Sequence, residues 1–277
     1  MRTIGCGLTA LAVSLTACAQ DLPGASVISS SESVGVGDGR RVMFSVVDAA
    51  DGEYLASPDR TATVTLADEN GSPLDTYPTE FLWVEEGERG VYVAYLDVRA
   101  AETYRATLEV GGLGQTRPTG LLVVDDPQVL QPGDPAQPSV TRTADEAREL
   151  ESVTSDPTPD PRFYQSSIDA ALTSGVPTVV VFGSPRWCIS PTCASLLDQV
   201  KGLAHGYPGI EFIHVETYED TDVENRDDLV TVPAVADWGL PSEPWVFVID
   251  DTGEIVATFE GVASDAELSH AFDRVAG

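Results

Sequence analysis

Positively charged residues are scarce in this chain, and their scarcity excludes two classes of partner. There are 15 Lys and Arg residues against 45 Asp and Glu, which gives a formal net charge of −30. Only one of the bases is a lysine, Lys201. A surface this acidic repels nucleic-acid phosphates and anionic lipid headgroups, so we expect no nucleic-acid partner and no binding to headgroups. An acid-rich, lysine-poor surface also suits high salt, because salt screens the repulsion among its negative charges.

Histidine and cysteine, which supply many catalytic and metal-binding groups, are scarce as well. The 277 residues include three His and four Cys, and neither type occurs between residues 19 and 187. Within residues 34–125 of that segment, the acids fall mostly at turns, where solvation explains them. We therefore expect a spacer or interaction module there rather than an enzyme. Beyond the N-terminus, no run is long and apolar enough to form a transmembrane helix.

The N-terminus has the features of a bacterial export signal. Met1-Arg2 is followed by small apolar residues up to Ala17, a stretch too short to span a bilayer stably. Leu15-Thr16-Ala17-Cys18 resembles the bacterial lipobox, whose cysteine becomes the lipidated first residue after cleavage. We expect a lipoprotein signal peptide over residues 1–17, and a membrane anchor at Cys18. The protein would then sit on the outer face of the cytoplasmic membrane, or on the periplasmic side, where disulfides persist. A plain secretory signal is the alternative.

Composition divides the remaining chain into a tether, two domains and a linker. Residues 18–33 are small and polar, which predicts a flexible tether. Residues 34–125 contain short runs of alternating, β-branched and aromatic residues separated by turn signals, without a helix. Six or seven such strands predict a β-sandwich of immunoglobulin-like type. Residues 126–161 contain seven prolines among acids and small polar residues, so we expect an extended linker with a short helix at Ala144–Leu150.

From residue 162 onward, strand patterns alternate with helix patterns. This order predicts an α/β domain with a mixed sheet over residues 162–277. Asp250–Gly253 is the expected turn of a hairpin, and Ser264 with Glu267 has the spacing of a helix capping box. The expected elements are helices at 167–174, 191–204, 234–238 and 263–275, and strands at 178–182, 210–215, 245–249 and 254–259.

Two cysteines, Cys188 and Cys193, fall between the predicted strand 178–182 and the helix that follows it. If the leader is processed as expected, they are the only thiols left to pair. Residues five apart on a regular helix diverge by about 140°, so Cys188 cannot share a helix with Cys193 and still pair with it. Ser190 as N-cap and Pro191 as first helical residue would place Cys193 in the first turn, with Cys188 outside. The helix dipole would then stabilise a thiolate at Cys193 more than one at Cys188, so either sulfur is a candidate for the attacking group.

Three separated motifs in residues 162–277 resemble those of the thioredoxin superfamily. The first is the apolar strand leading to Trp187-Cys188 and a second cysteine at a helix start. The second is Trp238-Gly239-Leu240-Pro241-Ser242-Glu243-Pro244, similar to the family's segment that ends in a cis-proline. The third is the hairpin around 245–254 with Phe259-Glu260-Gly261. With its export signal, the chain is similar to membrane-anchored thioredoxin-like lipoproteins of bacteria. The N-terminal sandwich lies outside this resemblance.

The resemblance implies thiol–disulfide exchange with protein thiols and disulfides, without a cofactor. It assigns Cys188 as the attacking thiol and Cys193 as the resolving one. It also implies that Pro244 lies against the disulfide and leaves backbone groups free to pair with a substrate, with Trp187 beside the attacking cysteine.

Two features depart from the family pattern. Four residues separate the cysteines where the family has two, and the usual buried acid of the preceding strand is missing. Glu216, after the next strand, and Glu243, beside the proline, are the candidate proton acceptors, although both positions are more typical of solvated surface acids.

Three alternatives use the same fold differently. The cysteines could form a permanent structural disulfide in a non-catalytic binding or scaffold lipoprotein. A Sco-like copper chaperone would need a histidine beside two thiolates, but the spacing of His214 from the cysteines does not match that family's pattern. The other two histidines, His205 and His270, are expected at the surface. We therefore assign no metal site from the sequence. A peroxiredoxin would need a Pro-x-x-x-Thr-x-x-Cys signature, with a threonine three residues before the cysteine. That position holds Pro185 before Cys188 and Ser190 before Cys193, so the signature is missing.

Overall fold

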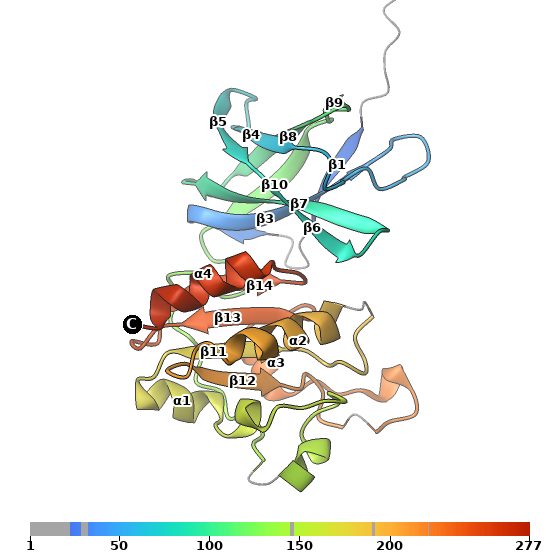
Figure 1. The fold of residues 1–277 in the computed structure, drawn as a ribbon. Helices are drawn as coiled ribbons and strands as arrows, with labels where there is room; N and C mark the ends of the chain where they lie inside the picture. Colours follow the sequence, from blue (N-terminus) through green and yellow to red (C-terminus); the bar gives the residue numbers. More distant parts are fainter. Residues whose placement is uncertain (1–22, 29–32, 145–146, 190–191, 221) are drawn as a thin grey trace, which may run out of the picture.

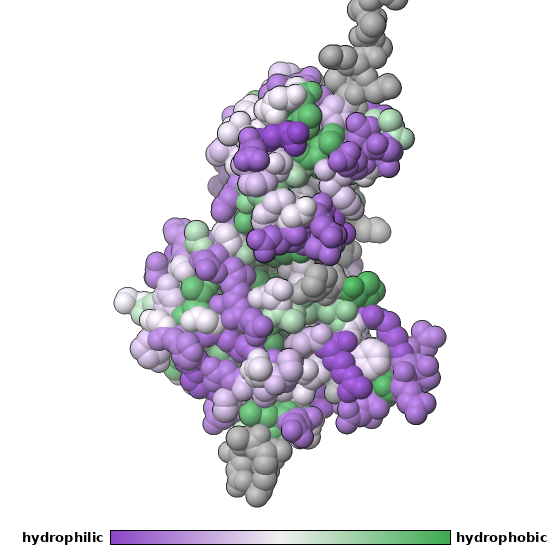
Figure 2. Space-filling model, turned by 45° about the vertical axis from the view of Figure 1, so that its right-hand side comes forward, coloured by the Kyte–Doolittle hydropathy of each residue, from purple (hydrophilic) through white to green (hydrophobic). Residues whose placement is uncertain are grey.

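The computed structural model describes residues 23–277 except 29–32, 145–146, 190–191 and 221, and these form two units stacked one above the other (Figure 1). The predicted signal peptide 1–17, the lipidation site Cys18 and most of the predicted tether 18–33 lie outside the described residues. The tether prediction was wrong for Gly24–Ile28, which form a strand paired with Met43–Val47 and belong to the first unit. None of the described helices is long and apolar enough to cross a membrane. Figure 2 shows hydrophilic residues over much of the visible face of both units, as the acid-rich composition predicts.

The first unit is a β-sandwich of two sheets, as predicted. Its strands are β1 (Gly24–Ile28), β2 (Val34–Gly35), β3 (Gly37–Val47), β4 (Ala62–Ala67), β5 (Pro73–Pro78), β6 (Glu80–Glu85), β7 (Arg89–Val98), β8 (Thr103–Val110), β9 (Gly114–Gln115) and β10 (Thr119–Val124). One sheet has the order β1-β3-β7-β6 and the other β2-β10-β8-β4-β5, with β9 paired to β8. Phe44 and Tyr92 from the first sheet share a core with Leu66 and Leu108 from the second.

Alternation of apolar and polar residues explains why these segments are strands with one buried face. In β8, every second residue from Tyr104 to Val110 is buried, whereas Arg105 and Glu109 are exposed. The predicted number of six or seven strands was too low. The additional ones lack this signal: β2 and β9 have two residues each, and β5 is bounded by Pro73 and Pro78. Proline is tolerated in β5 because that strand lies at a sheet edge.

The second unit is a four-stranded mixed sheet with helices on both faces. Its strands are β11 (Thr178–Phe182), β12 (Glu211–Val215), β13 (Trp245–Ile249) and β14 (Ile255–Glu260), and its helices are α1 (Ile168–Ser174), α2 (Thr192–Ala204), α3 (Pro233–Asp237) and α4 (Asp265–Val275), with 3-10 turns at Pro161–Tyr164 and Arg226–Asp228. The sheet order is β12-β11-β13-β14; β12 is parallel to β11, and the other pairs are antiparallel. Every residue of β11 and β13 is buried because helices cover both faces.

The helix cap predicted for the last helix is present. Ser264 Oγ accepts a hydrogen bond from the Glu267 backbone at 3.2 Å, and Glu267 Oε2 accepts one from the Ser264 backbone at 2.9 Å. These reciprocal bonds satisfy two N–H groups that a helix start leaves without intrahelical partners.

The proline-rich segment 126–161 packs along the second unit. The backbone N–H of Gly133 donates to the Ile255 carbonyl at 2.8 Å, and the Ile255 N–H donates to the Asp134 carbonyl at 2.9 Å. The segment thereby pairs with the start of the edge strand β14. A 3-10 helix occupies Ala147–Ser152, in place of the helix predicted at Ala144–Leu150.

The two units touch each other directly, because Arg41 of β3 and Tyr95 of β7 both form a hydrogen bond with Glu267 of α4. Arg40 Nη1 donates to the Pro132 carbonyl at 2.8 Å, and Arg41 Nη2 donates to the Val262 carbonyl at 2.8 Å. A cavity of about 620 Å³ lies at this boundary, lined from both sides by residues that include Met43 and Phe259.

Candidate functional site

The predicted cysteine pair is present as a disulfide. Cys188 and Cys193 are joined by an S–S bond, and their Cα atoms are 6.1 Å apart. The loop after β11 turns tightly, because the backbone N–H groups of Trp187 and Cys188 both donate to the Ser184 carbonyl, at 3.1 and 2.9 Å. Cys193 is the second residue of α2. The predicted cap at Ser190 and Pro191 lies outside the described residues.

The two cysteines differ in their access to solvent. Cys193 is 1% exposed, whereas Cys188 is half-buried. A sulfur atom on another molecule therefore reaches Cys188 first. Cys193, in the first turn of α2, lies where unpaired backbone N–H groups favour a thiolate. The geometry separates a more accessible cysteine from a shielded one at the start of a helix.

A cis-proline lies near the shielded end of the pair. The Glu243–Pro244 peptide bond is cis, as predicted, and Pro244 is buried. Gly183, at the end of β11, lies between this proline and the cysteine. A Cβ placed on Gly183 would be 3.6 Å from the Pro244 Cβ and 3.7 Å from the Cys193 Cβ. Pro244 and Cys193 therefore both pack against Gly183 at the end of β11.

Glu243 reaches the disulfide itself. One of its carboxylate oxygens and the two cysteine sulfurs all lie within 4.8 Å of one another. Oε2 accepts hydrogen bonds from the Ser184 backbone at 2.7 Å and from Thr217 Oγ1 at 2.6 Å. Oε1 is buried and has no hydrogen-bond partner among the described residues. Burial raises the pKa of the Glu243 carboxyl above its ordinary value, and these hydrogen bonds only partly oppose it.

Glu216 is also buried, which was not expected of an acid at the start of a polar loop. It is 3% exposed, and its Oε2 accepts hydrogen bonds from the Ser155 backbone at 2.8 Å and from Ser155 Oγ at 2.7 Å. Ser155 Oγ lies 3.3 Å from Ser184 Oγ, so Glu216 is connected to the cysteine loop through two serines. Its other oxygen, Oε1, is buried without a partner in the described part of the chain. Glu216 also belongs to the lining of a cavity of about 300 Å³. Of the two acids suggested by the sequence, only Glu243 belongs to the group within 4.8 Å of the sulfurs.

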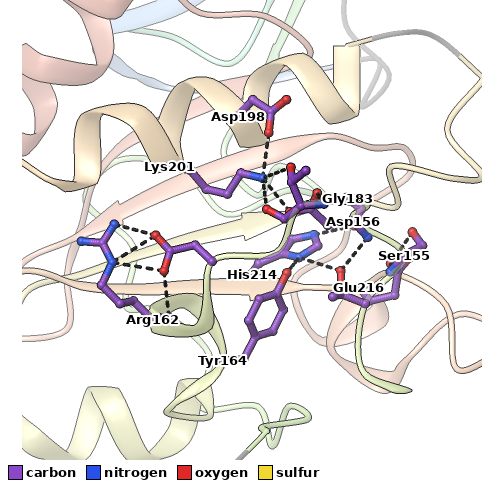
Figure 3. Close-up of polar contacts among 12 residues, drawn as sticks. Ser155, Asp156, Arg162, Tyr164, Gly183, Asp198, Lys201, His214 and Glu216 are labelled. Atoms are coloured by element: carbon purple, nitrogen blue, oxygen red, sulfur yellow. Dashed lines mark hydrogen bonds and ion pairs between the residues drawn. The ribbon is translucent and has the colours of Figure 1, made fainter. Parts of the chain in front are cut away.

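His214, on the neighbouring strand β12, supports the start of the cysteine loop at Gly183 (Figure 3). Its Nε2 is 2.9 Å from the Gly183 carbonyl, and because a carbonyl only accepts, Nε2 must carry the hydrogen. Its Nδ1 then accepts from the Tyr164 hydroxyl at 2.8 Å. Burial lowers the pKa of His214, which keeps the ring neutral. Both ring nitrogens are engaged, so the side chain positions Gly183 and is not available as the third ligand of a copper site.

The chain's one lysine fastens the segment that carries Ser155 onto α2 (Figure 3). Lys201 Nζ is 2.7 Å from Asp156 Oδ2 and 2.7 Å from Asp198 Oδ1, and it also donates to the Thr158 carbonyl at 3.0 Å. Asp156 is buried, so this ion pair is shielded from solvent. Sequence reasoning did not identify Ser155, Asp156 or Ser184, because isolated serines and acids in a proline-rich segment carry no recognisable pattern.

Trp187, the predicted neighbour of the attacking cysteine, is half-buried. The Arg186 guanidinium lies 5.4 Å from the centre of its ring, and the Arg186 backbone donates to Ser155 Oγ at 3.2 Å. His205 and His270 are exposed, as expected.

Comparisons with known proteins add little to this geometry. No family model matches the chain, and no curated protein matches it. Among solved structures, a DUF4426 family protein from Pseudomonas aeruginosa is similar, with 19% identity, coverage of 38% of this chain and 90% of that one, and a TM-score of 0.24. A TM-score this low supports no inference about fold or function.

Proposed function

We propose that the protein is an extracytoplasmic thiol–disulfide oxidoreductase, in which residues 162–277 form a thioredoxin-like domain and residues 34–125 an immunoglobulin-like one. The observation that carries the proposal is the asymmetric disulfide: half-buried Cys188 is bonded to fully shielded Cys193, with a cis-proline and a carboxylate beside them. The order of strand, cysteine loop, helix, parallel strand, cis-proline and hairpin supports the same fold.

In the reduced protein, the Cys188 thiolate attacks one sulfur of a substrate disulfide. A mixed disulfide forms, and the other substrate sulfur leaves as a thiolate that takes up a proton. Cys193 then loses its proton and attacks the Cys188 sulfur, which re-forms the internal disulfide and releases the second substrate thiolate. The substrate gains two electrons and the protein loses two. A dithiol protein returns them by the same steps in reverse.

Glu243 is the proton acceptor of the second step in this mechanism. Its carboxylate is near both sulfurs, and its Oε1 has no competing partner among the described residues. A carboxyl whose pKa is raised by burial accepts a proton from a thiol more readily than a solvated one does. It would take the place of the acid that the strand before the cysteines lacks.

The anchor and the sandwich complete the proposal. Lipidation at Cys18 would hold the protein on the outer face of the cytoplasmic membrane or on the periplasmic side, and protein thiols and disulfides are its partners there. The sandwich would act as a spacer or interaction module.

Single-cysteine variants test the proposal. Cys193→Ser should trap mixed disulfides through Cys188 when the chain is expressed with its leader, and Cys188→Ser should trap far fewer, because the remaining sulfur is shielded. The wild-type protein should reduce a disulfide-containing protein in the presence of a dithiol.

A reduction potential below about −300 mV, together with an absence of turnover and of trapped partners, would instead identify a permanent structural disulfide in a binding or scaffold protein.

A further inference from the structure

The cluster of Cys188, Cys193 and Glu243 has the donor atoms of a metal site, a role that is separate from thiol–disulfide exchange. Two sulfurs and one carboxylate oxygen lie within 4.8 Å of one another, and they come from three separate parts of the chain: the loop after β11, the start of α2 and the cis-proline segment. The cysteines are five residues apart, and folding brings the Glu243 carboxylate to them. We infer that, when the disulfide is reduced, these three side chains bind a zinc ion.

The spacing suits a tetrahedral zinc site. Zinc binds thiolate sulfur at about 2.3 Å and carboxylate oxygen at about 2.0–2.2 Å, so neighbouring ligand atoms of a tetrahedral site are about 3.5–3.8 Å apart. Sulfur atoms that are no longer bonded to each other separate to about this distance. The carboxylate oxygen is already within 4.8 Å of both. Small side-chain movements are sufficient, and three protein ligands leave the fourth position for water.

Glu243 is oriented as a metal ligand usually is. Its Oε2 is fixed by the Ser184 backbone N–H at 2.7 Å and by Thr217 Oγ1 at 2.6 Å. Such outer hydrogen bonds hold a ligating carboxylate in place. Its Oε1 is buried without a partner in the described structure, an arrangement that costs free energy unless a cation or a donor occupies the adjacent space.

The donor set favours zinc over other common ions. Mg²⁺ and Ca²⁺ prefer oxygen ligands and bind thiolates poorly. Cu(I) is satisfied by two thiolates and gains little from a carboxylate, whereas Zn²⁺ accepts sulfur and carboxylate oxygen together. His214 does not contribute, because Gly183 and Tyr164 engage its two ring nitrogens.

Zinc and the disulfide exclude each other. Binding requires both thiols to lose their protons, and the two thiolates then share the metal and no longer attack a disulfide. The inference rests on the proposed function only in requiring a reduced state. Zinc would act as a reversible inhibitor that holds the pair reduced.

The test uses the mature chain reduced with a phosphine, with both thiols counted by a thiol reagent. A chromophoric chelator competes for Zn²⁺, and Co²⁺ serves as a spectroscopic probe. We expect one metal per chain, thiolate-to-cobalt charge-transfer bands with the visible bands of tetrahedral Co²⁺, and no binding by the oxidised protein.

Glu243→Gln should weaken Zn²⁺ binding by about tenfold or more, because even outer partners of metal ligands are worth 10–100-fold. Glu211→Gln is the control: it removes the same charge at the end of β12 that lies away from the cysteine loop, and it should bind Zn²⁺ as the wild type does. Circular dichroism of the oxidised variants checks that both are folded.

Equal affinity of Glu243→Gln and wild type would overturn the proposal and leave simple dithiol chelation; absence of binding by the reduced wild type would also overturn it. Zinc binding is measured without a disulfide substrate. A negative result would therefore overturn the zinc site alone, whereas a negative exchange assay would overturn the oxidoreductase proposal.

Discussion

The side chains of Arg41 and Glu267 form a buried ion pair that joins the sandwich to the second unit, with 2.7 Å between Arg41 Nε and Glu267 Oε1. Only 7% and 5% of the two side chains are exposed. The hydroxyl of Tyr95, also from the sandwich, donates to the same oxygen at 2.6 Å. The carboxylate of Glu267 therefore caps α4 with one oxygen and binds the sandwich with both. The helix start and the domain contact depend on one side chain.

Glu267→Gln tests this shared role. The amide keeps the shape of the side chain but removes the charge opposite Arg41, which leaves a guanidinium buried without a counter-ion. Breaking a buried pair in this way costs about 3–5 kcal/mol. We expect the free energy of unfolding, measured by urea denaturation, to fall by about 3 kcal/mol. Asp251→Asn, in the exposed hairpin turn, is the control and should change it by less than about 0.5 kcal/mol. A similar loss in both variants would show that the pair contributes nothing specific.

The same pair predicts a dependence of stability on acid. Burial by itself would raise the pKa of Glu267, but the hydrogen bonds and charge of Arg41, aided by Tyr95 and the Ser264 backbone, lower it overall. A carboxyl with a lowered pKa in the folded state stabilises the protein above its unfolded pKa of about 4.3, and this contribution is lost as the pH falls through the folded value. The gap in unfolding free energy between wild type and Glu267→Gln should therefore narrow from pH 7 to pH 3. A constant gap would mean that the charge is not the source of the stabilisation.

His214 predicts a second pH effect, in a different window. Its ring is buried and neutral, and the desolvation that lowers its pKa outweighs the nearby charges of Glu216 and Asp156, which raise it. The unfolded chain takes up a proton at this histidine below a pH of about 6.5, whereas the folded chain resists it, so stability falls as the pH drops from 7 to 5.

His214→Gln should remove most of this slope, and also lower stability at pH 7 because the Tyr164 hydroxyl and the Gly183 carbonyl are no longer paired as before. Tyr164→Phe serves as the matched variant: it deletes the shorter of the two hydrogen bonds to Nδ1 and leaves the one from Thr154 Oγ1 at 3.3 Å. We expect it to cost about 1–2 kcal/mol but to leave the slope unchanged. Denaturation at pH 7, 6 and 5 distinguishes the two. An unchanged slope in His214→Gln would contradict this account.

Local patterns in the sequence were sufficient to predict much of the fold. Alternation predicted strands such as β8, a continuous apolar run predicted the central strand β11, and the Ser264–Glu267 spacing predicted a helix cap that the structure contains. These features depend on neighbours within a few residues, which is the range over which a sequence can be read directly.

Contacts between distant residues could not be predicted in this way. Arg41 and Glu267 are 226 residues apart, and nothing local to either one indicates the other. Ser155 similarly reaches Glu216 across 61 residues, from a segment whose prolines suggested only a linker. The burial of Glu216, and of one carboxylate oxygen of half-buried Glu243, was not expected because an acid in a polar loop is usually solvated. Both acids were nevertheless identified as candidates, from their positions beside a strand end and a proline.

The choice between these two acids in exchange chemistry is the sharpest functional prediction. A carboxylate oxygen of Glu243 lies within 4.8 Å of both sulfurs, whereas Glu216 is connected to the cysteine loop through Ser155 and Ser184. If Glu243 accepts the proton of Cys193, then Glu243→Gln should slow resolution of a mixed disulfide by about 100-fold, the lower end of what a positioned base contributes. Glu216→Gln should slow it by much less. Rapid-quench measurement of a single turnover separates attack by Cys188 from resolution by Cys193, and only resolution should change in Glu243→Gln. Equal slowing of both steps would instead assign Glu243 a structural role at the cis-proline.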